Sequence, residues 1–256
     1  MSEFKDVSIA SIESLKNNGW AQDIPYNESR IISRTFGSEI VDTDEVLFND
    51  VRKAIYFPDS PQFNVIKCDF TTHQKAIQNA KDRGLVIGFS GYASGGKGRG
   101  YDYDEELEAI RTIFTTLKQE DKTIGMVIHG GSREGIPAIA NIEAANSGIE
   151  RLGMLPFCGL DWLAEPAVDY LVVKGKNWGD ESEELGKSPD ILFLLGGGAN
   201  ALKDCKSAIK YGVKLVGIKL KEYPLDSAIN QINRDSFTNF YTSLDELASF
   251  LQTLKP

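Results

Sequence analysis

The stretch Met126–Gly148 constrains the fold more than any other part of the chain. It reads MVIHGGSREGIPAIANIEAANSG, which is an apolar run, a glycine pair and a segment rich in small residues. The apolar run is typical of a buried parallel strand, and the pair Gly130 and Gly131 allows a sharp turn. A helix that follows such a turn presents free N–H groups and the positive end of its dipole, which attract anions. The segment therefore predicts a strand, a tight turn and a helix whose start binds a phosphate or another anion.

Three side chains beside this turn are candidates for ligand contact. Ser132 can cap the helix, and Arg133 can clamp a phosphate or carboxylate through two parallel hydrogen bonds. His129 ends the strand, where it either contacts the ligand or forms a local hydrogen bond. An ordinary strand-to-helix turn also needs a glycine and a cap. The coincidence of the glycine pair with the serine and the arginine is what favours a binding site.

Two further glycine clusters follow predicted apolar strands. One comes after Ile191–Leu195, and the other comes after Leu85–Phe89 in a loop with five glycines between residues 90 and 100. Because the carboxyl ends of parallel strands share one edge of a sheet, we expect all three turns to face one crevice. The ligand contacts predicted from these two turns are Ser90, Gly91, Lys97, Gly196, Gly197, Gly198 and Asn200.

The segment Gly91–Lys97 also satisfies the GxxxxGK spacing of a P-loop. Position 98, however, is glycine, where a P-loop places the Ser or Thr that binds Mg²⁺. No later apolar strand ends in the aspartate that would complete the metal site. We therefore interpret Lys97 as a point charge near a phosphate and not as part of an NTPase.

Composition argues against several classes of protein. The chain has 28 Lys and Arg against 37 Asp and Glu, and this net charge of -9 argues against nonspecific nucleic-acid binding. The sequence contains no apolar run long enough for a membrane span and no secretion signal, so we expect no membrane partner and a cytoplasmic location. Three widely spaced cysteines and two histidines predict neither a disulfide framework nor a metal site, and no cofactor is indicated.

From Leu85 onward, predicted strands and helices alternate regularly. This alternation predicts an α/β fold with a Rossmann-like parallel sheet and helices on both faces. We expect strands at 85–89, 123–128, 151–155, 169–173, 190–195 and 214–218, and helices at 103–118, 134–147, 199–211 and 243–253. Residues 1–83 are expected to form a small α+β extension, with helices at 45–54 and 72–83 and a strand at 63–68. Residues 84–256 are expected to form the ligand-binding domain.

The motifs GFSGYASGG, HGGSREGIPAIANIEAANSG, LGMLP and LLGGGANALKD follow one another in this order. In this succession the chain resembles the SLOG superfamily of Rossmann-like nucleotide-binding proteins, which includes the LONELY GUY-type phosphoribohydrolases. The resemblance covers about residues 84–256 and implies nucleotide binding, with a final strand and helix within 239–254. It also implies a homodimer or higher homo-oligomer, with the helix 134–147 as a candidate interface.

The residues that LONELY GUY enzymes use for bond cleavage are not matched. Their PGGxGTxxE motif places its glutamate at Leu202 or Lys203 of this chain, and the helix expected to carry the arginine has neither Arg nor Lys before Lys187. The sequence therefore predicts a sensor or carrier of a nucleotide or nucleotide-derived phosphorylated ligand. The alternative is a hydrolase or transferase acting on an N-glycosidic bond, with Glu143 or Asp204 as the acid-base group, so enzymatic activity stays open.

Overall fold

We analysed a computed structural model of the 256-residue chain. It describes residues 73–93, 103–156, 159, 162, 164, 168–174 and 177–254, together with short strands at 39–40, 47–48 and 64–65. In this described part of the chain, no helix has the length and apolar character needed to cross a membrane.

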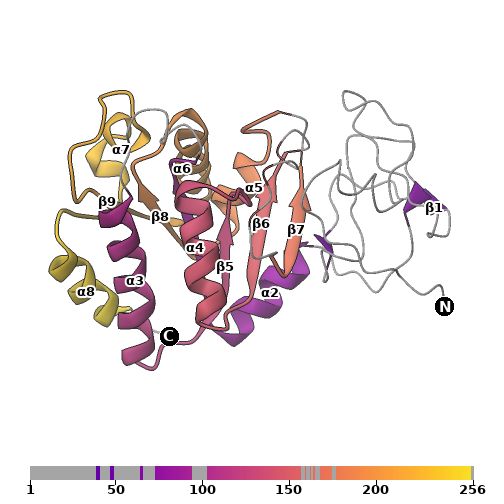
Figure 1. The fold of residues 1–256 in the computed structure, drawn as a ribbon, viewed down its shortest axis with the longest axis horizontal. Helices are drawn as coiled ribbons and strands as arrows, with labels where there is room; N and C mark the ends of the chain where they lie inside the picture. The colour runs from indigo at the N-terminus through magenta and orange to yellow at the C-terminus, as the bar shows by residue number, and fades with distance from the viewer. Residues whose placement is uncertain are drawn as a thin grey trace.

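The centre of the protein is a parallel sheet (Figure 1). Its parallel strands are β4 (Leu85–Gly91), β5 (Ile124–His129), β6 (Arg151–Leu155), β7 (Tyr170–Val173), β8 (Ile191–Leu195), β9 (Lys214–Ile218) and β10 (Asn239–Tyr241). With β2 (Leu47–Phe48), which pairs antiparallel with β7, they form an eight-stranded sheet in the order β10-β9-β8-β4-β5-β6-β7-β2. Separately, β1 (Glu39–Ile40) pairs antiparallel with β3 (Asn64–Val65). The predicted Rossmann-like α/β fold is confirmed.

Helices cover both faces of the sheet (Figure 1). One face carries α3 (Asp104–Gln119), α4 (Gly135–Asn146) and α8 (Leu244–Thr253), and the other carries α2 (His73–Arg83), α5 (Ser182–Lys187) and α6 (Ala199–Tyr211). The short α7 (Ala228–Gln231) and the 3-10 helix η4 (Arg234–Ser236) connect β9 to β10. The helices predicted after residue 85 are all present, with their ends shifted by at most one residue.

Two local predictions near the amino terminus can be compared with short strands that the structure describes. The helix predicted over 45–54 is wrong at Leu47 and Phe48, because these residues form β2 and pair with Val172 and Leu171 of β7. Pairing with a strand distant in sequence thus outweighs the local helical pattern. Of the strand predicted over 63–68, residues 64–65 form β3, and the other residues lie outside the described part of the chain.

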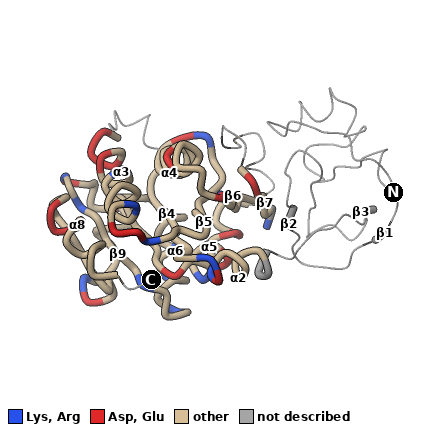
Figure 2. Tube along the Cα trace, turned by 90° about the horizontal axis from the view of Figure 1, so that it is seen from below, with Lys and Arg blue, Asp and Glu red and all other residues tan. Residues whose placement is uncertain are grey.

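Two apolar layers hold the helices against the sheet. Alternate strand residues point to opposite faces, so Phe89 packs under α3 and α4 while its neighbour Gly88 faces the side of α6. Phe89 stacks between Phe193 and Phe114, at centroid distances of 5.5 and 6.0 Å. The central strands carry no Lys, Arg, Asp or Glu, and charged residues lie on the surrounding helices and loops (Figure 2). A parallel sheet covered on both faces requires such uninterrupted apolar strands.

Helix α2 precedes the domain boundary predicted between residues 83 and 84. It nevertheless packs on β4 and β5, and its Ala76, Ile77 and Ala80 belong to the apolar core. The division of the chain into an extension and a ligand-binding domain stays a prediction.

The order of the strands creates a switch point between β4 and β8. From β4 the chain passes through α3 to β5 on one side, and from β8 it passes through α6 to β9 on the other side. The two connections therefore diverge and cover opposite faces of the sheet. In open α/β sheets, ligands bind in the crevice at such a point, outside the carboxyl ends of the strands.

Candidate ligand-binding site

The three glycine turns leave the sheet at its carboxyl edge. In the strand register, Phe89 of β4 lies beside His129 of β5, and Gly91 lies beside Leu195 of β8. The bends after His129 and Leu195 are thus on the same side of the molecule, as the predicted crevice requires.

Most of the glycines that the structure describes in these turns are required by the fold itself. Gly131, Gly135, Gly196 and Gly197 have φ angles between 64° and 90°, which side-chain-bearing residues rarely adopt. At Gly91, a Cβ atom would lie 2.5 Å from both the Ile136 side chain and the Leu195 carbonyl oxygen. These positions explain how the chain turns, but they say nothing about a ligand.

Gly130 and Gly198 differ from the other glycines that the structure describes in these turns. Neither has a positive φ, and a Cβ atom at Gly130 would find its nearest neighbour, Cγ of Pro137, at 3.5 Å. At Gly198 the nearest atom, Cε1 of Tyr92, would lie at 3.9 Å. Both distances are ordinary van der Waals contacts or longer. Neither a positive φ nor the packing of the described residues therefore requires glycine at these two positions.

The two helices that begin at this edge lack compensation for their dipoles. α4 begins after Glu134 and α6 begins after Gly198, and neither helix has a side-chain cap or an acidic residue in its first turn. By contrast, α3 and α8 begin with carboxylates, and Ser243 caps α8. Both helix starts consequently keep a partial positive charge. At α4 the N–H groups of Glu134 and Ile136 already donate within the protein, whereas the first N–H groups of α6 have no partner within their helix.

The turn after β5 is held by its own hydrogen bonds. Ser132 Oγ accepts from Glu134 N at 3.3 Å and donates to Glu134 O at 3.1 Å, so this hydroxyl stabilises the turn and does not cap α4. Arg133 N donates to Trp162 O, and Ala164 N donates to Gly131 O, both at 2.7 Å. These two bonds fix the segment around Trp162 beside the turn.

The side chain of Arg133 is exposed at this edge. Its Cζ lies 5.3 Å from the centroid of the Trp162 ring, which is itself 37% exposed. The pair presents a guanidinium and an indole together, so it offers a positive charge and a flat aromatic surface next to the start of α4.

Two predicted contact residues face the protein interior instead. His129 is fully buried, and its Nδ1 accepts from Gly131 N at 3.1 Å. Burial, followed by the nearby Arg151, lowers the pKa of His129 to about 3, although a hydrogen bond with Asn141 opposes this, so the imidazole is neutral. Ser90 is 3% exposed, and its hydroxyl donates to Asp204 at 2.7 Å. Of the two roles considered for His129, ligand contact or a local hydrogen bond, the structure shows the local hydrogen bond.

The two acid-base candidates are not brought together. Glu143 lies near the middle of α4 and forms an ion pair with Arg111 of α3 at 3.1 Å, between the two helices. Asp204 is buried in α6, where burial raises the pKa of its carboxyl to about 6 against the opposing effects of Ser182, Ser90 and Lys203. Asn200 lies in the first turn of α6, and its carbonyl oxygen accepts from Ser182 Oγ at 3.4 Å. Lys97 lies outside the described residues.

Sequence reasoning missed Tyr92 and Glu181. The Tyr92 carbonyl accepts from Ile136 N at 2.8 Å, and its ring faces Gly198, so Tyr92 lies between the starts of α4 and α6. Glu181 precedes α5, and its carboxylate accepts from Gly179 N at 2.9 Å. Burial, with a smaller effect of Asp204, raises the pKa of Glu181 to about 7. The position of Tyr92 directly after a strand that ends in glycine was the available signal for that residue.

The fold and this edge define a Rossmann-like α/β protein with a candidate crevice at its switch point. No family model matches the chain, and no curated protein matches it. Among solved structures, it is similar to the molybdenum cofactor binding protein from Rippkaea orientalis, with a TM-score of 0.49 and 18% identity over 67% of this chain and 97% of that one.

Two other solved structures show a comparable likeness. The molybdenum cofactor carrier protein from Chlamydomonas reinhardtii has a TM-score of 0.42 and 21% identity, over 53% of this chain and 77% of that one. DNA processing protein A from Helicobacter pylori has a TM-score of 0.48 and 12% identity, over 67% and 82% of the two chains. These similarities concern the fold and assign no ligand to this chain. Family membership, the homo-oligomer and the expected lack of a nucleic-acid partner stay predictions.

Proposed function

We propose that the chain binds a nucleotide, or a nucleotide-derived phosphorylated ligand, at the edge where β4, β5 and β8 end, and that it senses or carries this ligand. The observation that carries the proposal is the pair Gly130 and Gly198. Glycine costs conformational entropy on folding, so a glycine that neither a positive φ nor the packing of the described residues requires calls for another reason. Close approach of a ligand to the backbone supplies that reason at both positions, beside two helix starts that attract anions.

The hydrogen bonds of the turns indicate where the phosphate binds. Near α4, the N–H groups of Gly131, Arg133, Glu134 and Ile136 already donate within the protein. The first N–H groups of α6 have no partner within their helix and no side-chain cap. The phosphate therefore binds mainly at the start of α6, and Arg133 contributes charge from the side of α4.

The exposed Trp162 supports a ligand that also carries a planar base. Aromatic side chains bind bases by stacking on their faces, and each stacked base contributes about 1–3 kcal/mol. Trp162 presents its ring beside Arg133, within the same group of turns. A phosphorylated sugar without a base would leave this surface unused.

The proposal is tested by isothermal titration with nucleoside monophosphates, diphosphates, dinucleotides and inorganic phosphate, on the wild type and four alanine variants. Gly130→Ala and Gly198→Ala should keep the wild-type melting temperature without ligand and lose at least tenfold in affinity for the ligand. Gly135→Ala is the folding control, because its Cβ would lie 2.1 Å from the Tyr92 carbonyl oxygen at a φ of 64°. Arg133→Ala should weaken binding by about 1.5–3 kcal/mol.

In a melting experiment, ligand at 100 times its dissociation constant should stabilise the wild type by about 2.7 kcal/mol. Absence of binding across the panel, or full affinity in both Gly130→Ala and Gly198→Ala, would contradict the proposal.

The second candidate function is hydrolysis or transfer at an N-glycosidic bond. It is favoured by Glu181 and Asp204, two buried carboxyl groups whose pKa values of about 7 and 6 suit proton transfer near neutral pH. The same titration samples, analysed by chromatography for free base, separate the two functions. Release of free base by the wild type and by Glu143→Gln, but not by Glu181→Gln or Asp204→Asn, would show that the protein is an enzyme of this class. The assignment as a sensor or carrier would then be wrong.

A further inference from the structure

A cavity of about 750 Å³ lies beside β9 and the edge strand β10, and its lining includes none of the glycine turns. It is bounded by the loop after β9, by α7 and the segment up to η4, and by β10. Its volume is within the range of about 300–1,000 Å³ that small-molecule sites occupy. The residues that line it are all in the described part of the chain.

The inner side of the cavity is apolar. Phe237 and Phe240 meet edge to face at a centroid distance of 5.1 Å, and both rings lie over Gly217 of β9. A Cβ atom at Gly217 would lie 2.6 Å from Phe240 and 2.8 Å from Phe237, so only glycine lets the rings approach the strand. Ile229 and Ile232 are buried and complete the apolar lining.

The rim of the cavity is cationic, although the chain as a whole carries a net charge of -9. Lys219, Lys221 and Arg234 line it, with Glu222 as the acidic residue among the lining residues. Lys221 is held by Glu105 and Glu106 of α3, at 3.0 and 2.8 Å. Lys221 therefore already has ion-pair partners within the protein.

The other two cations are available to a ligand. Lys219 pairs with Glu222, whose side chain is 90% exposed, and such exposed pairs contribute little. Arg234 lies with its Cζ 3.5 Å from the Phe240 centroid and takes part in none of the ion pairs found among the described residues. The Phe240 ring and a hydrogen bond from Arg234 Nη2 to the Phe240 carbonyl oxygen at 3.5 Å orient the guanidinium, and none of the described carboxylates forms an ion pair with it.

We propose that this cavity is a second binding site, for a small organic anion with an apolar body. Arg234 and Lys219 bind the carboxylate or phosphate of the ligand, and Phe237, Ile229 and Ile232 contact its apolar part. A planar guanidinium binds either head group through two parallel hydrogen bonds. The site is separate from the nucleotide crevice and does not depend on the function proposed there.

The test uses four probes that separate charge from apolar contact: 3-phenylpropionate, phenyl phosphate, 3-phenylpropan-1-ol and inorganic phosphate. Dissociation constants are measured on the full chain by following backbone amide shifts in NMR spectra. At least one of the two aromatic anions should bind and shift the amides of residues 219–242. The neutral alcohol and inorganic phosphate should each bind at least tenfold more weakly than that anion.

Two variants locate the site. Arg234→Gln should weaken the aromatic anion at least tenfold, whereas Arg111→Gln, which removes an exposed arginine of α3, should leave its affinity unchanged. Gly198→Ala should also leave it unchanged, which separates this cavity from the crevice of the glycine turns. The proposal is overturned if neither aromatic anion binds at millimolar concentration, if the alcohol binds as tightly as the acid, or if Arg234→Gln binds like the wild type.

Discussion

Asp204 is a carboxyl group that the fold removes from water. Its pKa of about 6, against an ordinary value of 3.8, means that the folded protein holds this proton more tightly than the unfolded chain does. The folded state is therefore favoured most below about pH 4, and this contribution is lost as the pH rises through about 6. Glu181, with a pKa of about 7, shifts in the same direction.

Asp204→Asn should remove the part of the pH dependence that belongs to this residue. The wild type should lose about 2 kcal/mol of unfolding free energy from Asp204 between pH 4 and pH 7, and the variant should not lose it. Urea unfolding at pH 4, 5, 6, 7 and 8 measures the difference. Asp82→Asn, at an exposed position of α2, is the control and should follow the wild-type profile. If the wild type and Asp204→Asn show the same slope, Asp204 is not the group that titrates.

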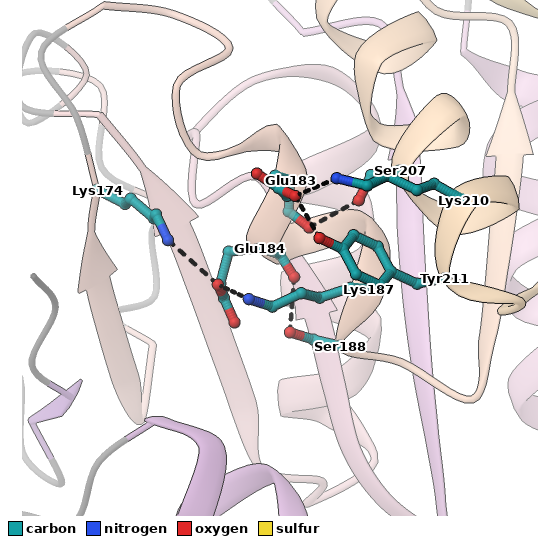
Figure 3. A network of polar contacts seen from close by, with 8 residues as sticks. All are labelled: Lys174, Glu183, Glu184, Lys187, Ser188, Ser207, Lys210 and Tyr211. Atoms are coloured by element: carbon teal, nitrogen blue, oxygen red, sulfur yellow. Dashed lines mark hydrogen bonds and ion pairs between the residues drawn. The ribbon is translucent and has the colours of Figure 1, made fainter.

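Among the elements, α5 depends on its neighbours, because six residues are too few for a stable isolated helix. Glu184 is 1% exposed and pairs with Lys187 and with Lys174, which follows β7 (Figure 3). Glu183, the adjacent residue, lies on the exposed side and contacts Lys210 and Tyr211 of α6. The buried Glu184 thus connects α5 to Lys174 after β7, and the exposed Glu183 connects α5 to α6.

The two glutamates should differ strongly in their effect on stability. Glu184→Ala should reduce the unfolding free energy by about 2 kcal/mol, because it removes a buried carboxylate that pairs with the ammonium groups of both Lys174 and Lys187. Glu183→Ala should melt close to the wild type, since water and salt screen its exposed contacts. Thermal melts of both variants at one pH make the comparison. Equal losses would show that the ion pairs of Glu184 do not hold α5 in place.

A different prediction concerns the start of α6 at the candidate site. Ala199→Asp places a carboxylate in the exposed first turn of α6, where it interacts favourably with the helix dipole. The variant should be more stable than the wild type by about 0.3–1 kcal/mol and should bind the anionic ligand several-fold more weakly. Ala199→Asn is the uncharged control. Melting curves together with titrations measure both effects, and unchanged affinity in Ala199→Asp would argue against a phosphate at this helix.

At the scale of the whole molecule, the succession of strands and helices along the chain could be predicted, because buried parallel strands are continuous apolar runs. The run Ile191–Leu195 is one example, and its glycine turn also marks where the strand ends. A common edge for the three turns then follows from parallel pairing alone. The directions of the side chains could not be predicted in the same way. Ser90, for example, contacts Asp204 only because α6 packs on β4. The elements α7 and η4 were missed because such short helices show no periodicity.

The cavity beside β9 and β10 was also beyond sequence reasoning. Its apolar side depends on Phe237 and Phe240 meeting over Gly217, and its charged rim depends on Lys219 and Arg234 facing the same space. These residues belong to separate elements, and no motif joins them. Tertiary packing therefore decides this site, whereas local spacing predicted the glycine turns.

The central position of β4 has a consequence for the order of folding. β4 pairs with β5 soon after it in the chain, but its other neighbour is β8, and Val86 N donates to Asp190 across a sequence separation of 104 residues. A chain growing on the ribosome therefore holds β4 with one side unpaired until β8 emerges. The strand ends on both sides of the candidate crevice come together only at that late stage, so the ligand proposed for it should stabilise the finished protein but not the earlier intermediates.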